Sequence, residues 1–476
     1  MSANPPSMKL RLVETHNVSP PRNSVPSTTL PLTFSDAFWI PFSNTQRIFL
    51  YKIPSISTPI FLKSFLPDFK SSLSLSLQLF FPLTGSFLPF TDPTSKPNIL
   101  CEDGGSVSLK ISEATGDFDH LLGTDKKRLI NVKEFHPLVP DLMVDEETGK
   151  SSLLALQVTI FPDCGICFGI TYKHVVADGR SIAAFLHTWS SICKNNCIIP
   201  PDMVLPVIDR SLIPDPNGFI LDSCLKQIFA LQAAEPKDEE AEKQPSESEG
   251  EVRVRGTFVI TKNEIGKLRQ WILNRVGNEE LHLSTFVLTF SLIFVSSIKS
   301  EAAVRKSDVR ATDLCHLGQV VECRDRYEFK SIVPSEYFGN CLAYGCYSTA
   351  KRKDMEGEDG FLVAVRGLGY EIKQLEVNGV LTEAENWIDR FFGKARTGSI
   401  YTVAGSPRLG VYGLDFGWGR PAKVEVVSID GSNSVSIAES IDDEGGVEIG
   451  LALEKNQMEA FISIYEESKY KYCRTF

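Results

Sequence analysis

Two hydrophobic patterns alternate along the first part of the chain. Residues 9–15 alternate between apolar and polar side chains, and the runs at 47–53 and 107–111 are also typical of β-strands. Between them, Phe61–Leu79 carries apolar residues at helical spacing and is followed closely by Pro82. Because proline lacks a backbone donor and disrupts a continuing helix, this pattern predicts a helix that ends before Pro82.

A third pattern surrounds the stretch Thr171–Gly179, TYKHVVADG. Two apolar runs, Leu153–Phe161 and Cys167–Tyr172, flank the turn sequence PDCG and predict a β-hairpin. After Gly179, apolar residues recur at helical intervals, and they are Ile182, Phe185, Leu186, Trp189 and Ile192. His174 is therefore expected between a buried strand and a helix, where rigid elements can hold a working side chain in place.

The character of the sequence changes after Pro200. Prolines crowd the segment Pro200–Pro216, and Glu235–Glu251 is acidic and almost free of apolar residues. Such a composition cannot bury a core, which predicts an exposed crossover with a disordered centre.

A second globular half follows the crossover. It begins with a strand near Val252, a helix at Lys262–Val276 and a buried segment at Ser284–Ile298, and later strands are predicted at 319–323, 424–429, 435–439 and 447–453. We predict an α/β protein with an N-terminal domain at 1–199, a linker at 200–251 and a C-terminal domain at 252–476.

Composition and charge narrow the class of protein. With 476 residues, 42% apolar and 23% charged, the chain is typical of a two-domain globular protein. The net charge of −11 argues against a general nucleic-acid or anionic-membrane binder, since both need a basic surface. The apolar run Phe286–Val295 is shorter than the roughly 20 residues of a spanning helix, so it is interpreted as a buried core helix. We expect neither a nucleic acid nor a membrane as partner.

The 11 cysteines are scattered, as in a cytosolic enzyme with reduced thiols, so we expect a cytoplasmic location. Cys164 and Cys167 form a C-x-x-C motif, but no second pair stands at zinc-site spacing. Ordinary thiols are therefore favoured over a redox or metal centre, and no metal site is predicted.

Among the 7 histidines, His174 has the most informative surroundings, because it stands four residues before Asp178 in a short turn. A His-x-x-x-Asp pattern is common by chance, and a histidine in such a place is more often structural. The sequence has no G-x-S-x-G elbow, Walker loop or H-E-x-x-H motif, and the GLG at 367–369 lacks the third glycine of a dinucleotide fingerprint.

Three motifs in combination carry more information. HVVADG at 174–179, YFGNC at 337–341 and DFGWG at 415–419 resemble the plant BAHD family of coenzyme A-dependent acyltransferases. The similarity runs over nearly the whole chain, through LTFSDAFW, LQLFFPLTGSF, LSTFVLT and VECRDR. YFGNC, the run VAGSPRLGVYGLDFGWGRP and the tail GGVEIGLAL resemble the anthocyanin, flavonoid and phenolic glucoside acyltransferases, malonyltransferases especially.

This resemblance implies two domains like chloramphenicol acetyltransferase, with mixed sheets, packed helices and a channel between them. It implies that His174 is a general base that deprotonates an acceptor hydroxyl, which then attacks the thioester of an acyl-CoA. No acyl-enzyme and no metal or bound cofactor is then needed, since acyl-CoA is a co-substrate. We expect a monomer that moves malonyl to a sugar hydroxyl of a phenolic or flavonoid glycoside.

The resemblance also suggests roles around His174. Asp178 and Gly179 are expected to shape the loop, with Arg324 as the ion-pair partner of Asp178. Asp415 and Trp418 have two interpretations, either a direct part in catalysis or, as we favour, the fixing of a tight loop with Gly417 and Gly419 beside the CoA entrance.

Three further residues bear on the substrates. Ser406 stands where relatives that acylate shikimate carry a tryptophan, and it is a candidate oxyanion donor. Lys173 and Arg180 are candidates for binding a malonyl carboxylate, and solvent-facing charge is the alternative for both. Two other functions stay open at this point, a hydroxycinnamoyl-CoA-dependent acyltransferase and a catalytically dead binding protein of the same fold.

Overall fold

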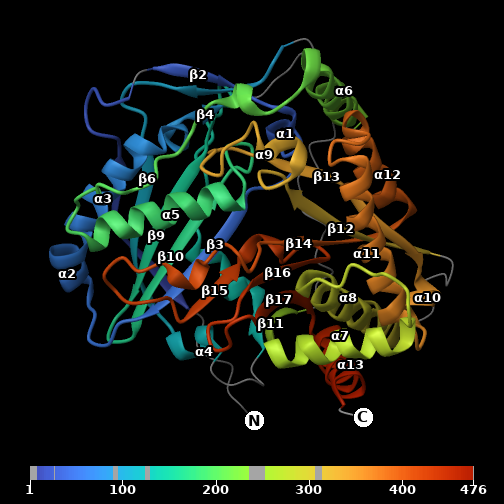
Figure 1. Ribbon diagram of the computed structural model, residues 1–476. Coiled ribbons are helices and arrows are strands. Elements are labelled where there is room, and N and C mark those ends of the chain that lie inside the picture. Colours follow the sequence, from blue (N-terminus) through green and yellow to red (C-terminus); the bar gives the residue numbers. More distant parts are fainter. Residues whose placement is uncertain are drawn as a thin grey trace. The chain divides into compact units, whose positions relative to one another are not determined.

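The computed structural model describes residues 8–25, 27–88, 95–123, 129–234, 252–305 and 313–474 (Figure 1). The chain forms two compact units, each of which mixes strands and helices. The first unit consists of Met1–Phe229, Phe329–Cys341 and Leu409–Ser428, and the second of Ala230–Glu328, Leu342–Arg408 and Ile429–Phe476. The units therefore differ from the contiguous division predicted at 199 and 252, because two segments from the C-terminal half belong to the first unit.

The first unit is built on a six-stranded mixed sheet in the order β1-β6-β9-β10-β3-β15 (Figure 1). β6 and β9 pair in parallel, and the other neighbours pair antiparallel. A small sheet has the order β2-β5-β4-β8. The strands of this unit are β1 (Lys9–Val18), β2 (Thr28–Pro31), β3 (Thr45–Lys52), β4 (Ser86–Phe87), β5 (Asn98–Cys101), β6 (Val107–Thr115), β7 (Ile130–Asn131), β8 (Ser151–Ser152), β9 (Leu154–Phe161), β10 (Gly165–Tyr172) and β15 (Lys423–Val426).

Helices cover both faces of this sheet. On one face, Phe69 of α3 and Trp189 of α5 pack on Phe168 of β10, with ring centroids 4.4–5.9 Å apart. On the other face, Leu50 and Cys167 share a buried cluster with α4. Because residue 167 and residue 168 point to opposite faces, the strand is apolar throughout, as expected of a strand covered on both sides. The helices here are α1 (Phe34–Ala37), α2 (Thr58–Ile60), α3 (Leu66–Leu79), α4 (Phe118–Leu122) and α5 (Gly179–Lys194).

The predicted hairpin and the two predicted helices of this region are confirmed. The helix expected over Phe61–Leu79 consists of one π-helical turn, Phe61–Phe65, followed by α3, and it ends before Pro82. The strand expected at 424–429 is shorter than predicted, since β15 ends at Val426 and a 3₁₀ turn, Val427–Ile429, follows.

Part of the predicted crossover is helical, because α6 (Phe219–Ala234) follows the proline-rich segment. The sequence did not predict this helix. The acidic centre, Glu235–Glu251, lies outside the described residues, so its disorder stays a prediction.

In the second unit, the strands lie in the order β13-β12-β14-β16-β17-β11. β12, β14 and β16 pair in parallel, and the remaining neighbours pair antiparallel. The strands are β11 (Arg253–Ile260), β12 (Leu314–Glu322), β13 (Leu342–Lys351), β14 (Gly398–Ala404), β16 (Ser434–Glu439) and β17 (Val447–Glu454). The helices are α7 (Lys262–Val276), α8 (Thr285–Val304), α10 (Arg352–Glu356), α11 (Gly360–Asn378), α12 (Trp387–Thr397) and α13 (Lys455–Cys473). Helix α9 (Tyr327–Lys330) begins in the second unit and ends in the segment Phe329–Cys341 of the first unit.

Helix α8 is the core helix of the second unit and contacts α7, α11 and α13. It is longer than predicted, and by length and composition it meets the requirement for crossing a membrane. However, 72% of its most apolar window is buried inside the protein. This burial accounts for its composition, as expected of a helix that is apolar on all sides.

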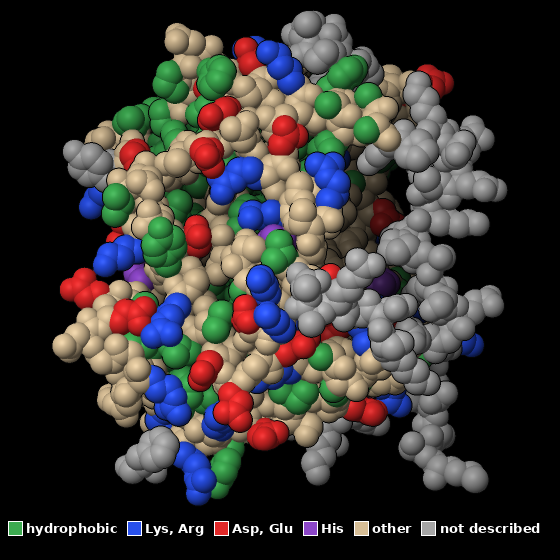
Figure 2. Space-filling view, turned by 90° about the vertical axis from the view of Figure 1, so that its right-hand side faces the viewer, with side chains coloured by type: hydrophobic (Ala, Val, Ile, Leu, Met, Phe, Trp, Pro, Cys, Tyr) green, Lys and Arg blue, Asp and Glu red, His purple; other side chains and the backbone are tan. Residues whose placement is uncertain are grey.

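The described surface carries both signs of charge. Over the face drawn in Figure 2, lysine and arginine side chains are interspersed with aspartate and glutamate. A broad basic patch of the kind that binds a nucleic-acid backbone is not seen on this face.

Candidate active site

His174 lies on the loop between β10, which ends at Tyr172, and α5, which begins at Gly179. This is the place that the hydrophobic pattern predicted. Val175, Val176 and Ala177 are fully buried and anchor the loop in the core of the first unit. His174 itself keeps partial exposure to solvent.

The imidazole of His174 is held from two sides. Its Nδ1 lies 3.1 Å from Oδ1 of Asn340, which comes from the YFGNC motif. The ring of Trp39 stacks on the imidazole, with centroids 3.6 Å apart and planes 20° from parallel. Together, these contacts fix both the plane of the ring and its rotation within that plane.

The surroundings keep His174 neutral. Burial lowers the pKa of His174 to about 4, against the opposing effects of the Asp178 charge and the hydrogen bonds to the ring. A neutral imidazole with Nδ1 directed at Asn340 leaves Nε2 as the nitrogen that can accept a proton. A free Nε2 on an oriented ring is compatible with the predicted role of general base.

Asp178 is buried and caps α5. One carboxylate oxygen accepts a hydrogen bond from the N–H of Ser181 at 2.9 Å, and the other accepts from the N–H of Cys341 at 3.0 Å. These bonds join the His174 loop to the YFGNC segment. They support the expectation that Asp178 shapes the loop rather than transferring a proton.

Gly179 is the first residue of α5 and does not have a positive φ angle. A Cβ atom at this position would meet Leu409 at 3.5 Å, which is an ordinary contact. The backbone therefore does not require a glycine here, and the role of Gly179 in shaping the loop stays a prediction.

Each residue of YFGNC has a structural partner. The hydroxyl of Tyr337 and the carbonyl of Phe338 accept hydrogen bonds from Arg210, at 3.0 and 3.1 Å. A Cβ atom on Gly339 would overlap the guanidinium of Arg210, so only glycine fits. Asn340 then faces His174, and the N–H of Cys341 reaches the carboxylate that caps α5.

The DFGWG segment forms a tight loop in the first unit. Oδ1 of Asp415 accepts hydrogen bonds from the N–H groups of Gly417 and Gly419, both at 2.9 Å. Both glycines have positive φ angles, 92° and 86°, which other residues rarely adopt. Oδ2 of Asp415 pairs with Lys194 at the end of α5, at 2.7 Å.

These contacts account for the loop without a catalytic role for Asp415. Partial burial opposes its ionisation, yet Lys194 and the two N–H groups hold the pKa of Asp415 below its ordinary value. Trp418 is buried in an aromatic cluster formed by Tyr51, Phe61, Phe65, Phe69 and Phe416, with centroids 5.0–6.3 Å away. The geometry supports the loop-fixing interpretation, and the position beside the CoA entrance stays a prediction.

The two candidate cations near His174 differ in their surroundings. Lys173 is partly buried, which lowers its pKa, and its ammonium lies 5.4 Å from the ring centre of Phe87. Arg180 lies close enough to Glu336 to contribute to the lowered pKa of that carboxylate, after the larger effects of hydrogen bonds. The role of either cation toward a substrate stays a prediction.

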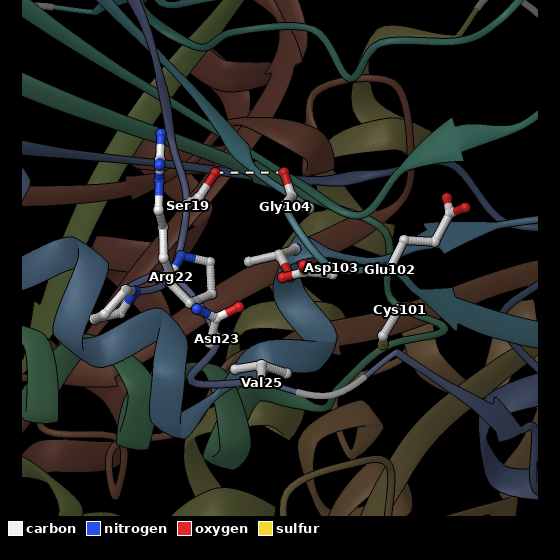
Figure 3. Close-up of a pocket in the computed structure, with 12 residues that line it drawn as sticks. Ser19, Arg22, Asn23, Val25, Cys101, Glu102, Asp103 and Gly104 are labelled. Atoms are coloured by element: carbon white, nitrogen blue, oxygen red, sulfur yellow. Dashed lines mark hydrogen bonds between the residues drawn. The ribbon is translucent and has the colours of Figure 1, made fainter.

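A cavity of about 290 Å³ lies elsewhere in the first unit, between the segments that precede β2 and follow β5 (Figure 3). Arg22, Asn23 and Val25 line it together with Cys101 and Asp103, and none of the predicted site residues does. Within the described parts of the chain, no group of histidine, cysteine or acidic residues is arranged to hold a metal ion.

Comparison with known proteins decides the family. The model of the Transferase family matches residues 8–468. The chain is 34% identical over 463 residues to phenolic glucoside malonyltransferase 2 of Arabidopsis thaliana, with 96% of this chain and 99% of the relative covered. It is 35% identical over 477 residues to coumaroyl-CoA:anthocyanidin 3-O-glucoside-6''-O-coumaroyltransferase 1 of the same plant, with 97% and 98% covered. The chain belongs to the BAHD acyltransferase family.

The fold agrees with this assignment. The crystal structure of vinorine synthase superposes with a TM-score of 0.64 at 19% identity and covers 96% of this chain and 98% of that chain. The predicted mixed α/β fold with two domains is therefore confirmed. The protein is an acyl-CoA-dependent acyltransferase, as the motifs indicated.

Two residues that the BAHD resemblance singled out lie in the second unit. Arg324 is buried and pairs with Glu322 at 2.8 Å. The hydroxyl of Ser406 accepts a hydrogen bond from the N–H of Arg408 at 3.2 Å. The proposed pairing of Arg324 with Asp178 and the oxyanion role of Ser406 stay predictions.

The sequence did not identify the residues that hold His174. Asn340 and Trp39 both lie in segments that were quoted for the family resemblance, YFGNC and LTFSDAFW, but neither received a role. A buried asparagine has no periodic signal, and its partner is 166 residues away in the chain. The two motifs were therefore the only signals in the sequence that could have indicated Asn340 and Trp39.

Proposed function

We propose that the protein transfers a malonyl group from malonyl-CoA to a sugar hydroxyl of a phenolic or flavonoid glycoside. The two relatives quoted above are named for different acyl groups, malonyl and coumaroyl, but both names include a glucoside acceptor. A glycosylated phenolic acceptor is thus the feature common to both names. The observation that carries the reaction is the neutral imidazole of His174, oriented by Asn340 and Trp39.

The chemistry follows from this orientation. Nε2 of His174 takes the proton of the acceptor hydroxyl while its oxygen forms a bond to the thioester carbonyl carbon. The tetrahedral intermediate then expels the CoA thiolate as the carbon–sulfur bond breaks, and the imidazolium returns the proton to that thiolate. The products are an ester and free CoA, without an acyl-enzyme. Ser406 is our candidate for the oxyanion donor.

Lys173 supports malonyl as the donor. A malonyl group carries a carboxylate, and the partly buried ammonium of a residue next to His174 in the chain would bind it more strongly than a fully solvated one. The ammonium of Lys173 lies over the ring of Phe87, and a ring leaves the ammonium able to meet an anion. The alternative donor is a hydroxycinnamoyl-CoA.

A donor competition distinguishes these functions. The purified enzyme is given malonyl-CoA or p-coumaroyl-CoA with a set of phenolic and flavonoid glucosides, while CoA release and product mass are measured. We expect a higher kcat/KM with malonyl-CoA, and a fall of about tenfold or more in the malonyl-to-coumaroyl ratio for Lys173→Met. Arg180→Ala is the matched control and should keep the ratio. A higher kcat/KM with p-coumaroyl-CoA, or an unchanged ratio in Lys173→Met, would contradict the malonyl proposal.

His174→Gln tests the reaction itself and should lose CoA release with every donor.

We further propose a cytoplasmic monomer. The state of the thiols supports the location, since all 11 cysteines are free, including the exposed Cys164.

A further inference from the structure

A buried carboxylate lies behind the residue that orients His174. Asp36, from α1, has no exposed surface. Its Oδ1 accepts hydrogen bonds from the side-chain Nδ2 and the backbone N–H of Asn340, at 2.8 and 3.3 Å. Its Oδ2 accepts from the backbone N–H and the hydroxyl of Thr33, both at 2.9 Å. All four partners are donors, so the group acts as an acceptor on both oxygens, as a carboxylate does.

Arg210 supplies the opposite charge. Its Nε lies 3.6 Å from Oδ2 of Asp36, and both side chains are almost fully buried. Burial opposes the charged form of Arg210, but the nearby Asp36 and Tyr337 raise its pKa above the ordinary value. The same guanidinium also donates to the carbonyl of Val176, at 2.8 Å, within the His174 loop. The pair is therefore connected to the catalytic loop through both its members.

The carboxylate determines which way the amide of Asn340 points. Since Asp36 accepts only, the atom that faces it must be the NH₂ group, and this group also donates to the backbone carbonyl of His174 at 2.9 Å. The carbonyl oxygen of the amide must then face the imidazole, 3.1 Å from Nδ1. An amide oxygen can only accept, so Nδ1 must carry the proton and Nε2 must be bare.

We propose that Asp36 is a positioning residue for the acyl transfer, which acts through the Asn340 amide to hold His174 as the Nδ1–H tautomer. This inference rests on the proposed role of His174 as the base. The carboxylate also polarises the amide, so the hydrogen bond to Nδ1–H strengthens as positive charge develops on the ring. A series of polar contacts thus runs from the buried Arg210 through Asp36 and Asn340 to His174, with an amide placed between the carboxylate and the histidine.

The tautomer can be measured without any substrate. In wild-type protein labelled with ¹⁵N-histidine, the His174 signals are assigned by their loss in His174→Gln. At neutral pH we expect a protonated Nδ1 and a bare Nε2, which resonate far apart. A protonated Nε2 in the wild type would overturn the proposal, whatever the activity of the enzyme.

Kinetics test the role of the carboxylate. In Asp36→Asn, the NH₂ group of Asn340 loses the charged one of its two acceptors and keeps the His174 carbonyl, so its orientation is held less firmly. We expect the ¹⁵N spectrum to show mixed tautomers and kcat to fall about 10–100-fold. The KM for the acyl-CoA should change by less than about twofold, because Asp36 touches neither substrate. Asp163→Asn, an exposed aspartate in the turn between β9 and β10, is the matched control. A wild-type spectrum together with a wild-type kcat in Asp36→Asn would refute the positioning role.

Asn340→Ala and His174→Gln provide two further tests. If Asp36→Asn does not fold, Asn340→Ala breaks the same series of contacts but leaves Asp36 and Arg210 together, and it should show the same mixed tautomers and loss of kcat. Wild-type tautomers and kcat in this variant would refute the positioning role. If His174→Gln keeps its activity, the proposed reaction fails, while the ¹⁵N spectrum still reports whether Asp36 sets the tautomer.

Discussion

The indole of Trp39 lies against the imidazole of His174, with ring centroids 3.6 Å apart. Stacking fixes the plane of the imidazole, so we expect Trp39→Leu to lower kcat by about tenfold, through a base that samples unproductive orientations. Trp39→Phe keeps a flat ring and should lose less. Steady-state kcat and KM for both variants check this, and equal losses in the two would show that stacking is not the cause.

The lowered pKa of His174 has a kinetic consequence. Because burial lowers this pKa to about 4, the base is already deprotonated in the folded enzyme from neutral pH down to about pH 5. We therefore expect kcat/KM to stay flat over this range, wherever the protein remains folded. A decline centred near 6.5, the ordinary value for histidine, would show that the imidazole is fully solvated.

The same shift affects stability. The unfolded chain binds a proton at His174 near pH 6.5, whereas the folded protein does so only near pH 4. The contribution of His174 to the free energy of unfolding is therefore fully present above pH 6.5. It is lost as the pH falls from 6.5 toward 4, by about 3 kcal/mol at most. Urea unfolding at several pH values should show this slope, and it should be reduced in His174→Gln.

Asp178 should matter for stability as well as activity. Asp178→Ala removes the cap of α5 and leaves the N–H of Cys341 without its acceptor, so we expect a loss of about 2–3 kcal/mol in the free energy of unfolding. Asp178→Asn keeps one acceptor and should lose less. Denaturant midpoints measure both, and a variant that is inactive but fully stable would instead point to a direct chemical role.

Asp415 offers a contrast between structural and catalytic roles. Asp415→Ala should lower the melting temperature and reduce kcat, since the DFGWG loop loses the acceptor of two N–H groups. Lys194→Met removes the exposed ion pair alone and should cost less than about 1 kcal/mol. If Asp415→Ala keeps its melting temperature but loses kcat by about 10²–10⁴-fold, the loop-fixing interpretation is wrong.

Local patterns predicted the strands and helices around His174 well, because their signals lie within a few consecutive residues. Helix α6 was missed since it follows a proline-rich segment, and α11 and α12 lie in a stretch where the notable signal was the GLG at 367–369. Those glycines lie inside α11, which is consistent with setting the dinucleotide motif aside.

The residues of the candidate site also divide into those with a local signal in the sequence and those without one. His174 could be found because the motif and the strand–helix pattern coincide at one place. The chain of Arg210, Asp36 and Asn340 could not, since each residue comes from a different segment and only the fold brings the three together. Tertiary hydrogen bonds of buried polar groups leave no period in the sequence.

The non-contiguous make-up of the first unit sets an order on its assembly. His174 leaves the ribosome 166 residues before Asn340, and β15 of the same sheet follows later still. At typical rates of synthesis, about 5–20 residues per second, the loop waits roughly 10–30 s for its partner. For most of that interval, the nascent chain carries Asp36 and Arg210 without the residue that connects them to the histidine. A gene fragment that ends within the acidic crossover would therefore yield an unfinished sheet and an unoriented base, not a smaller working enzyme.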